Sequence, residues 1–202
     1  MTDVAWFRTP ADGDPGTLNA CYNALDIHVV RGRADEVALS LDGADQTFAR
    51  LLTEVAACAG VLRAFGVDVG DQVALGSVPR HHAVVVVLAA ARVGAVVQYD
   101  DSPGAVGKVV IRTGEEGVVI GVDGEDLPWD VAMRAGRTDP AGCADVPGDA
   151  VLCRHGADTL TILEALGASD DPTAAAPAGA RLVEVGGLTL WSFDPPGEQP
   201  PA

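Results

Sequence analysis

The stretch that decides the fold is GDQVALGSVPRHHAVVVVLAAARVGAVVQY, residues 70–99. Its first apolar run, QVAL, follows a turn and is typical of a buried strand. Pro79 and Gly94 bracket a long apolar segment, which predicts a buried helix with proline near its start and glycine at its end. Residues 95–99 predict a second strand. This order favours two parallel strands joined by a crossover helix.

The flanking segments extend the α/β pattern. Residues 46–67 carry the clearest amphipathic helix, whose apolar stripe stops at Gly66. Up to residue 99 the order helix, strand, helix, strand, helix, strand predicts one mostly parallel sheet with crossover helices. The other predicted elements are a helix over 17–32 capped by Thr17, strands in 36–43, 108–113, 117–124 and 149–155, short helices in 127–136 and 157–167, and a C-terminal β-hairpin turning at Gly186-Gly187.

These elements define the expected domain organisation. We expect an N-terminal arm over 1–16, an α/β domain over 17–167, a linker over 168–180, a hairpin over 181–194 and a flexible tail over 195–202. The apolar run 83–91 has nine residues before Arg92, far short of the ~20 that cross a bilayer.

The chain is strongly acidic, with a formal net charge of −16. Such a surface repels phosphate backbones and anionic headgroups, which excludes nucleic acid and membrane surfaces as expected partners. Solubility is the simplest interpretation of the charge, and steering of a cationic ligand is the other. The four cysteines show no CxxC spacing and the start has no signal-peptide pattern, so we expect reduced thiols and a cytoplasmic location.

The stretch GDAVLCRHGADTLTIL, residues 148–163, has the order of a phosphate-binding segment: strand, glycine-bearing loop, helix. Its composition does not match that function. Gly156 is its only loop glycine and no lysine follows, whereas phosphate loops normally need several glycines and a countercharge. Asp158, expected in the first helical turn, would repel a phosphate.

Other chemical groupings are weak. The four histidines form no HxxxH or HExxH pattern, so no metal site is predicted. His81 and His82 are expected to face solvent or a partner. Cys153 and His155 share a strand face, which permits a thiol–imidazole pair, although a buried cysteine beside a strand-end histidine is the simpler interpretation. No catalytic residue is assigned.

The front of the chain, WFRTPADGDPGTLNACYNALDIHVVRG, resembles the acetyl- and propionyl-CoA synthetases of the adenylate-forming superfamily. The residues that match the family's early signature, which we expect to be structural, are Trp6, Phe7, Leu18, Asn19, Tyr22, Asn23, Asp26 and His28, together with Gly16. The likeness continues through 46–99 and reaches about residue 155. The resemblance implies the fold of the family's N-terminal subdomain. His82 or a neighbour stands where the family has a helix glutamate.

Two departures from the family bear on function. The family's G-G-F-S-P segment, which faces CoA, reads DDSPG here, so Ser102 and Pro103 match while Asp100 and Asp101 replace both glycines. Lys108 is the nearby cation that could meet a CoA phosphate, and two carboxylates beside it would weaken that role.

The second departure is at the family's T-S-G-T-T-G phosphate loop, which aligns with RHGADTL. Only Gly156 clearly matches, with Thr159 as a possible remnant of the nucleotide-binding hydroxyls. The remaining adenine, magnesium and acyl motifs and the catalytic lysine of the C-terminal domain have no room in 202 residues.

We therefore expect a truncated, degenerate acyl-CoA synthetase relative that does not adenylate an acid alone. A regulatory pseudoenzyme that docks on a full-length synthetase or another protein, with the PRHH helix start as one contact point, and the front half of a split synthetase are the alternatives. No cofactor is expected, and ATP with Mg²⁺ and CoA would bind only if the family's site persists.

Overall fold

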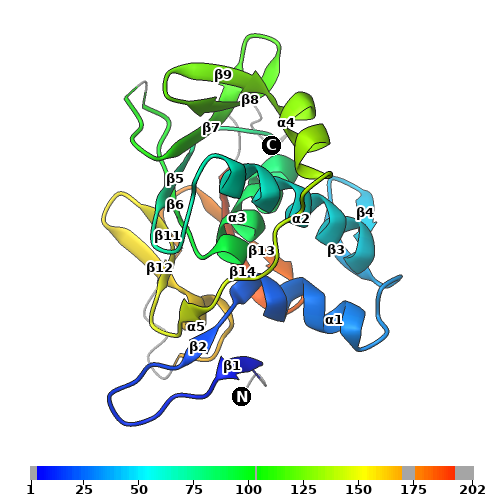
Figure 1. Ribbon diagram of the computed structural model, residues 1–202, viewed down its shortest axis with the longest axis vertical. Helices are drawn as coiled ribbons and strands as arrows, with labels where there is room; N and C mark the ends of the chain where they lie inside the picture. The colour runs from blue at the N-terminus through cyan, green and yellow to red at the C-terminus, as the bar shows by residue number, and fades with distance from the viewer. Residues whose placement is uncertain (1–3, 103, 170–175, 194–202) are drawn as a thin grey trace.

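A computed structural model describes residues 4–102, 104–169 and 176–193 (Figure 1). Its centre is a seven-stranded sheet in the order β12-β11-β6-β5-β7-β8-β9, in which β11, β6, β5 and β7 run parallel. The strands are β5 (Gln72–Leu75), β6 (Val96–Tyr99), β7 (Val109–Gly114), β8 (Gly117–Val122), β9 (Glu125–Pro128), β11 (Val151–His155) and β12 (Asp158–Thr161). The predicted α/β class is confirmed.

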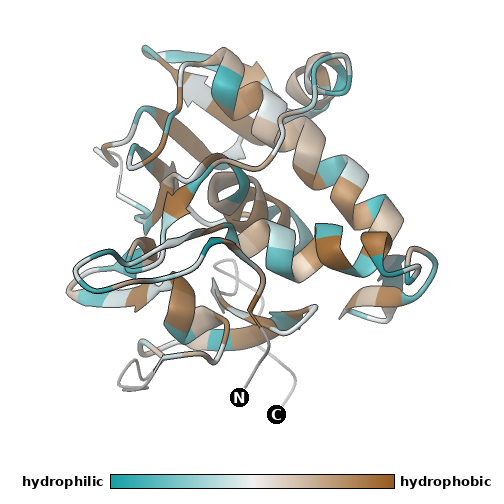
Figure 2. Cartoon of the chain, turned by 60° about the horizontal axis from the view of Figure 1, so that its bottom comes forward, coloured by the Kyte–Doolittle hydropathy of each residue, from teal (hydrophilic) through white to brown (hydrophobic). Residues whose placement is uncertain are grey.

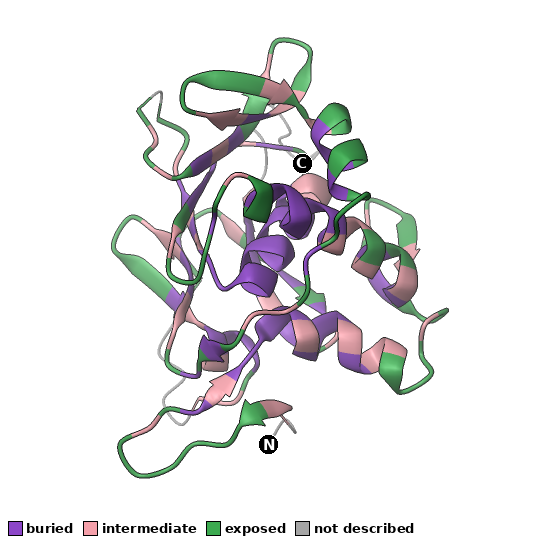
Figure 3. Ribbon diagram, in the orientation of Figure 1, coloured by how far each residue is buried: buried purple, intermediate pink, exposed green. Residues whose placement is uncertain are grey.

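The two long helices form the interior beside this sheet. Helix α3 (Arg80–Val93) connects β5 to β6, and α2 (Phe48–Ala64) packs against α3 (Figure 1). Every residue of α3 from Ala83 to Val93 is buried, which explains why this helix is apolar all round (Figures 2 and 3). Gly94 ends it in the left-handed conformation at φ 80°. Helix α4 (Trp129–Gly136) starts after Pro128, as predicted, and packs on α2 and β8.

The N-terminal segment departs from the predicted helix over 17–32. Thr17 lies in strand β2 (Thr17–Leu18), which pairs with β1 (Trp6–Arg8) and β10 (Val146–Pro147). The helical part is a π-helical turn, η1 (Tyr22–Asp26), continued by α1 (Ile27–Val30). Asn19 takes the capping role instead of Thr17, because its Oδ1 accepts a hydrogen bond from the Tyr22 amide at 3.1 Å.

The first predicted strand does not join the parallel sheet. Strand β3 (Val37–Leu41) pairs instead with β4 (Ala44–Thr47) in a separate hairpin. Asp42 and Gly43 both have positive φ, 53° and 79°, the geometry of a two-residue hairpin turn. The predicted helix over 46–67 therefore begins two residues too early: α2 starts at Phe48, and Thr47 caps it by accepting from the Arg50 amide at 3.4 Å.

The predicted helix over 157–167 is also wrong in its first half. Residues 158–161 form β12, antiparallel to β11, with His155 opposite Asp158. Gly156 makes the tight turn at φ 58°. The short helix α5 (Ile162–Ala165) begins only after Thr161, whose side chain forms a capping box with Glu164.

The C-terminal hairpin turns at Gly186-Gly187 as predicted. It consists of β13 (Ala180–Val185) and β14 (Leu188–Phe193), and β14 packs against α3 and α5. Part of the predicted linker, residues 170–175, and the whole predicted tail lie outside the described residues.

Candidate functional site

The carboxyl ends of three parallel strands meet at one cavity. Leu75, Tyr99 and His155 are the last residues of β5, β6 and β11, and they lie in register across the sheet. A cavity of about 440 Å³ opens above them and is also lined by Ser77, Asp100, Asp101 and Phe193. Ligands of open α/β sheets bind at this edge, so this cavity is the candidate functional site.

Two carboxylates form the polar side of the cavity. Asp101 accepts hydrogen bonds from the backbone amide of Ser77 and, at 2.8 Å, from its hydroxyl. Asp100 Oδ1 accepts from the Ser102 amide at 2.8 Å, and this bond lowers the pKa of Asp100. Asp100 is therefore a carboxylate at neutral pH. Neither aspartate forms an ion pair with a cationic side chain among the described residues.

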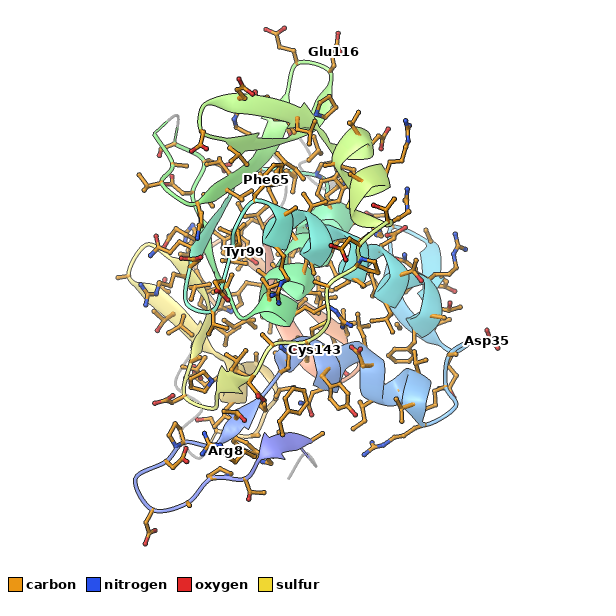
Figure 4. All side chains as sticks on the ribbon, viewed as in Figure 1. Arg8, Asp35, Phe65, Tyr99, Glu116 and Cys143 are labelled. Atoms are coloured by element: carbon orange, nitrogen blue, oxygen red, sulfur yellow. The ribbon has the colours of Figure 1, made fainter. Side chains whose placement is uncertain are left out.

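The aromatic side of the cavity comes from the C-terminal hairpin. The Phe193 ring lies 4.5 Å from the ring of His155 in a stacked arrangement and 4.8 Å from that of Tyr99 at 61°. Tyr99 lies in the middle of the molecule (Figure 4), and its hydroxyl donates to the carbonyl oxygen of Trp191. These contacts place an element from residues 188–193 against strands that end about 40 to 90 positions earlier.

Lys108 and Ser102 line one cavity, of about 460 Å³, beside β7 and β8. The Lys108 ammonium pairs there with Asp71 at 2.8 Å. Asp71 therefore competes for the cation that the resemblance assigns to a CoA phosphate. This hydrogen bond also lowers the pKa of Asp71. Pro103 lies outside the described residues.

The segment expected to be a phosphate-loop remnant has the wrong backbone for that role. Gly156 lies in the turn between β11 and β12. Thr159, on β12, pairs with Arg154 on the antiparallel strand β11. A phosphate cradle needs amides that converge at the start of a helix. Here the residues after the glycine form a ladder with β11 instead, and Asp158 is exposed in the strand rather than in a helical turn.

Other contacts take the place of the thiol–imidazole pair that the spacing of Cys153 and His155 permits. Cys153 is fully buried, and burial raises the pKa of its thiol. His155 stacks on Phe193. The structure therefore supports the simpler interpretation of a buried cysteine beside a strand-end histidine.

His82 is directed into the protein rather than toward solvent, which corrects the expectation for this residue, whereas the His81 side chain keeps 42% of its surface exposed. His81 Nε2 lies 2.8 Å from the Glu54 carboxylate on α2, and this contact lowers the pKa of Glu54. The His82 ring packs 5.0 Å from Trp129, and burial lowers the pKa of His82. Among the described residues, no group of three or more His, Cys, Asp or Glu side chains is placed to hold a metal ion.

The signature residues of the front segment connect the N-terminal helix to the rest of the fold. Asn19 Nδ2 lies 2.9–3.0 Å from the carbonyl oxygens of Ala91, Arg92 and Ala144. Asn23 exchanges hydrogen bonds with both backbone groups of Ala5.

The remaining signature residues also make contacts within the fold. Asp26 pairs with Arg92, and His28 Nε2 lies 3.0 Å from the Gly186 carbonyl oxygen. Tyr22 packs edge-on against Phe7, Leu18 is fully buried, and Trp6 packs against the core. None of these residues lines the candidate cavity.

Sequence reasoning missed three residues of the cavity. Ser77, Tyr99 and Phe193 belong to no sequence motif. Their shared signal is position: Tyr99 and Phe193 end strands, and Ser77 lies two residues after one. That signal becomes useful only when the strand order is known, because the order determines which strand ends meet.

The architecture is that of the N-terminal α/β region of acyl-CoA synthetases. A Brucella canis acyl-CoA synthetase superposes with a TM-score of 0.53 at 23% identity, covering 74% of this chain and 34% of that chain. An anthranilate CoA ligase solved with anthranoyl-AMP gives a TM-score of 0.56 at 14% identity, covering 74% and 36%. These likenesses establish the fold.

Sequence comparison establishes the family. Residues 27–128 match the AMP-binding enzyme family, and the chain belongs to it. It is 41% identical over 92 residues to the acetyl-coenzyme A synthetase of Rhodopirellula baltica and 37% identical over 95 residues to that of Streptomyces coelicolor. These alignments cover 40% and 45% of this chain but 14% of each relative, so the chain spans a small part of their length.

Proposed function

We propose that this chain is an acyl-CoA synthetase-like protein whose 202 residues do not form an acyl-adenylate by themselves. The observation that carries the proposal is the turn at Gly156. Where the resemblance places the phosphate loop, the chain forms a β-hairpin with His155 opposite Asp158. Adenylation depends on positioning and charge stabilisation around the phosphates, and a hairpin turn with an adjacent carboxylate supplies neither.

The charge at the carboxyl edge supports the same proposal. Asp100 and Asp101 line the cavity there and Asp158 lies beyond His155. Each carboxylate disfavours the approach of a nucleotide phosphate or a CoA phosphate. Lys108, the cation expected to compensate, is held by Asp71.

Pyrophosphate exchange tests the proposal directly. The purified chain is incubated with ATP, Mg²⁺, labelled pyrophosphate and either acetate or propionate, with an active acetyl-CoA synthetase as the positive control. We expect no acid-dependent exchange above buffer. Thermal denaturation with ATP, AMP, CoA and acetyl-CoA should likewise show no stabilisation, because specific binding would raise the melting temperature. Acid-dependent exchange would overturn the proposal.

A second candidate function is the front half of a synthetase completed by another chain. The sheet face opposite α3 favours this candidate because it is only partly covered. Gln98 and Val110 on that face are half-buried, and Arg112 is exposed. Parallel sheets are normally covered on both faces. If a neighbouring reading frame begins with the T-S-G-T-T-G loop, its product and this chain should co-purify and support exchange together. Co-purification without exchange would reject this candidate.

The charge also supports a proposal about the chain's surroundings. A net charge of −16 disfavours nucleic acid and anionic membrane surfaces as partners. No helix in the described ranges has the length and apolar character needed to cross a bilayer. We propose a cytoplasmic location, and fractionation of cells expressing the tagged chain tests it.

A further inference from the structure

The cavity at the carboxyl edge combines three features that together indicate a ligand. It is large enough for a small ligand, at about 440 Å³. One side carries the carboxylates of Asp100 and Asp101. The other side carries the aromatic rings of Tyr99 and Phe193. We ask which ligand chemistry this combination favours.

The electrostatics favour a cation. Among the described residues that line the cavity there is no lysine or arginine. Lys108 pairs with Asp71, and Arg112 on β7 pairs with Asp126 at 2.7 Å. The two carboxylates therefore present uncompensated negative charge to the cavity. A phosphate or a carboxylic acid placed there is repelled, whereas an ammonium group is attracted.

The hydrogen bonds hold one of these charges in a fixed position. Asp101 is held by both the amide and the hydroxyl of Ser77, which lies two residues after the end of β5. A carboxylate that is positioned before binding loses little conformational entropy when a ligand arrives. Asp101 is exposed, and these two hydrogen bonds distinguish it from an aspartate that is held only by solvent.

The apolar wall favours an organic cation over a metal ion. Phe193 is supported by His155 on one side and Tyr99 at its edge, with centroid distances of 4.5 and 4.8 Å. Leu75 and Val78 add aliphatic surface to the lining. Aromatic rings beside carboxylates attract alkylammonium groups through the cation–π interaction and through apolar contact. A bare divalent ion would need several more oxygen ligands than this cavity provides.

We propose that the cavity at the ends of β5, β6 and β11 binds a small organic ammonium cation between the carboxylates of Asp100 and Asp101 and the ring of Phe193. The proposal does not depend on whether the chain adenylates acids, because it concerns only residues that line this cavity. The strongly acidic surface would assist binding, because its negative potential raises the local concentration of cations at the cavity mouth.

Choline and its neutral carbon isostere, 3,3-dimethylbutan-1-ol, provide the test. The full chain is titrated with each compound at constant ionic strength and followed by calorimetry and by amide chemical shifts. We expect choline to bind at least about tenfold more tightly than the alcohol, with the largest shifts at Ser77, Asp101 and Phe193. Butyrate should not bind. Equal affinities for choline and the alcohol, or shifts spread over the acidic surface, would overturn the proposal.

Three variants separate a built site from general attraction by an acidic protein. Asp101→Asn removes the charge while its Oδ1 can still accept from the Ser77 amide and its Nδ2 can donate to the Ser77 hydroxyl oxygen, and it should weaken choline binding about fivefold or more. Phe193→Leu should weaken choline binding while leaving the weaker alcohol affinity within about twofold. The control Asp149→Asn removes the same charge from an exposed residue near the amino end of β11, the opposite edge of the sheet, and should leave choline affinity unchanged. Equal effects of Asp101→Asn and Asp149→Asn would reject the site.

Discussion

The guanidinium of Arg92 donates two hydrogen bonds, of 2.7 and 3.1 Å, to the carboxylate of Asp26 in the interior of the protein. Arg92 lies in the last turn of helix α3 and Asp26 ends the π-helical turn η1, so the pair joins the crossover helix to the N-terminal segment. The Arg92 Nε also donates to the carbonyl oxygen of Ala141 at 2.7 Å. Burial, the largest single influence, disfavours the charged guanidinium. The hydrogen bond and charge of Asp26, together with the neighbouring Cys21 and Cys143, outweigh burial and raise the pKa of Arg92.

Removing one partner of this pair should destabilise the fold strongly. Asp26→Asn leaves a buried guanidinium without its countercharge, so we expect a loss of about 3–5 kcal/mol in the free energy of unfolding. Urea denaturation measures it. The matched control is Asp126→Asn, which breaks the exposed pair with Arg112 and should cost no more than about 1 kcal/mol. Similar losses in the two variants would contradict the assignment of a buried, structural ion pair.

The hairpin turn against the N-terminal helix makes a sharper steric prediction. A Cβ at Gly186 would lie 2.1 Å from the Ala24 carbonyl oxygen and 2.8 Å from His28 Nε2, and the residue has φ 55°. Gly186→Ala must therefore separate the hairpin from the helix, at an expected cost above about 3 kcal/mol.

The adjacent glycine provides the control. Gly187 also has positive φ, 90°, but a Cβ there meets nothing within 4 Å. Gly187→Ala should cost only the backbone strain of about 1–2 kcal/mol. The two losses are compared in urea, and a smaller loss for Gly186→Ala than for Gly187→Ala would show that the hairpin does not pack as described.

Stability should fall on mild acidification because of His82. Burial lowers the pKa of this side chain, so the unfolded chain takes up a proton near pH 6.5 while the folded protein does not. The stability that neutral His82 contributes is complete above about pH 6.5 and is lost as the pH falls through its lower folded pKa.

Substitution of His82 isolates this contribution. His82→Phe should flatten the decline of the free energy of unfolding between about pH 6.5 and 5, a decline limited to about 1.4 kcal/mol per pH unit for one proton. Glu54, whose pKa is lowered, loses its contribution only below its ordinary value of 4.5, outside this window. Parallel pH profiles for the two proteins would contradict the prediction.

Grafting the family's phosphate loop should not restore nucleotide binding. Replacing residues 154–159 by Thr-Ser-Gly-Thr-Thr-Gly removes His155 from its stack on Phe193 and disrupts the pairing of β11 with β12. We expect a lower melting temperature and no calorimetric signal with ATP and Mg²⁺. Gly156→Ala, which strains only the turn, should cost about 1–2 kcal/mol and leave the nucleotide response unchanged. ATP binding by the graft would show that a latent nucleotide pocket persists.

The sequence predicted elements best where a single local rule governs them. Proline at position 79 and glycine at 94 bracket α3, and the amphipathic stripe up to Gly66 marks α2. The prediction failed where pairing partners decide the structure. Residues 158–161 favour a helical pattern locally, yet they form a strand because β11 offers a free edge and Gly156 permits the turn. The strand over 37–41 pairs with β4 for the same reason: a nearby Asp-Gly turn supplied a closer partner than the central sheet.

The sequence by itself determined the family likeness, the α/β class and the acidic charge, because motifs, periodicity and composition are local or additive properties. Only the tertiary structure decided which side chains share a site. It brought Phe193 to Tyr99 and His155 and placed Ser77 on Asp101. It also placed the Lys108 ammonium on Asp71. The physical reason is that strand order and register are set by long-range packing, so the neighbours of a strand end cannot be read from its own segment.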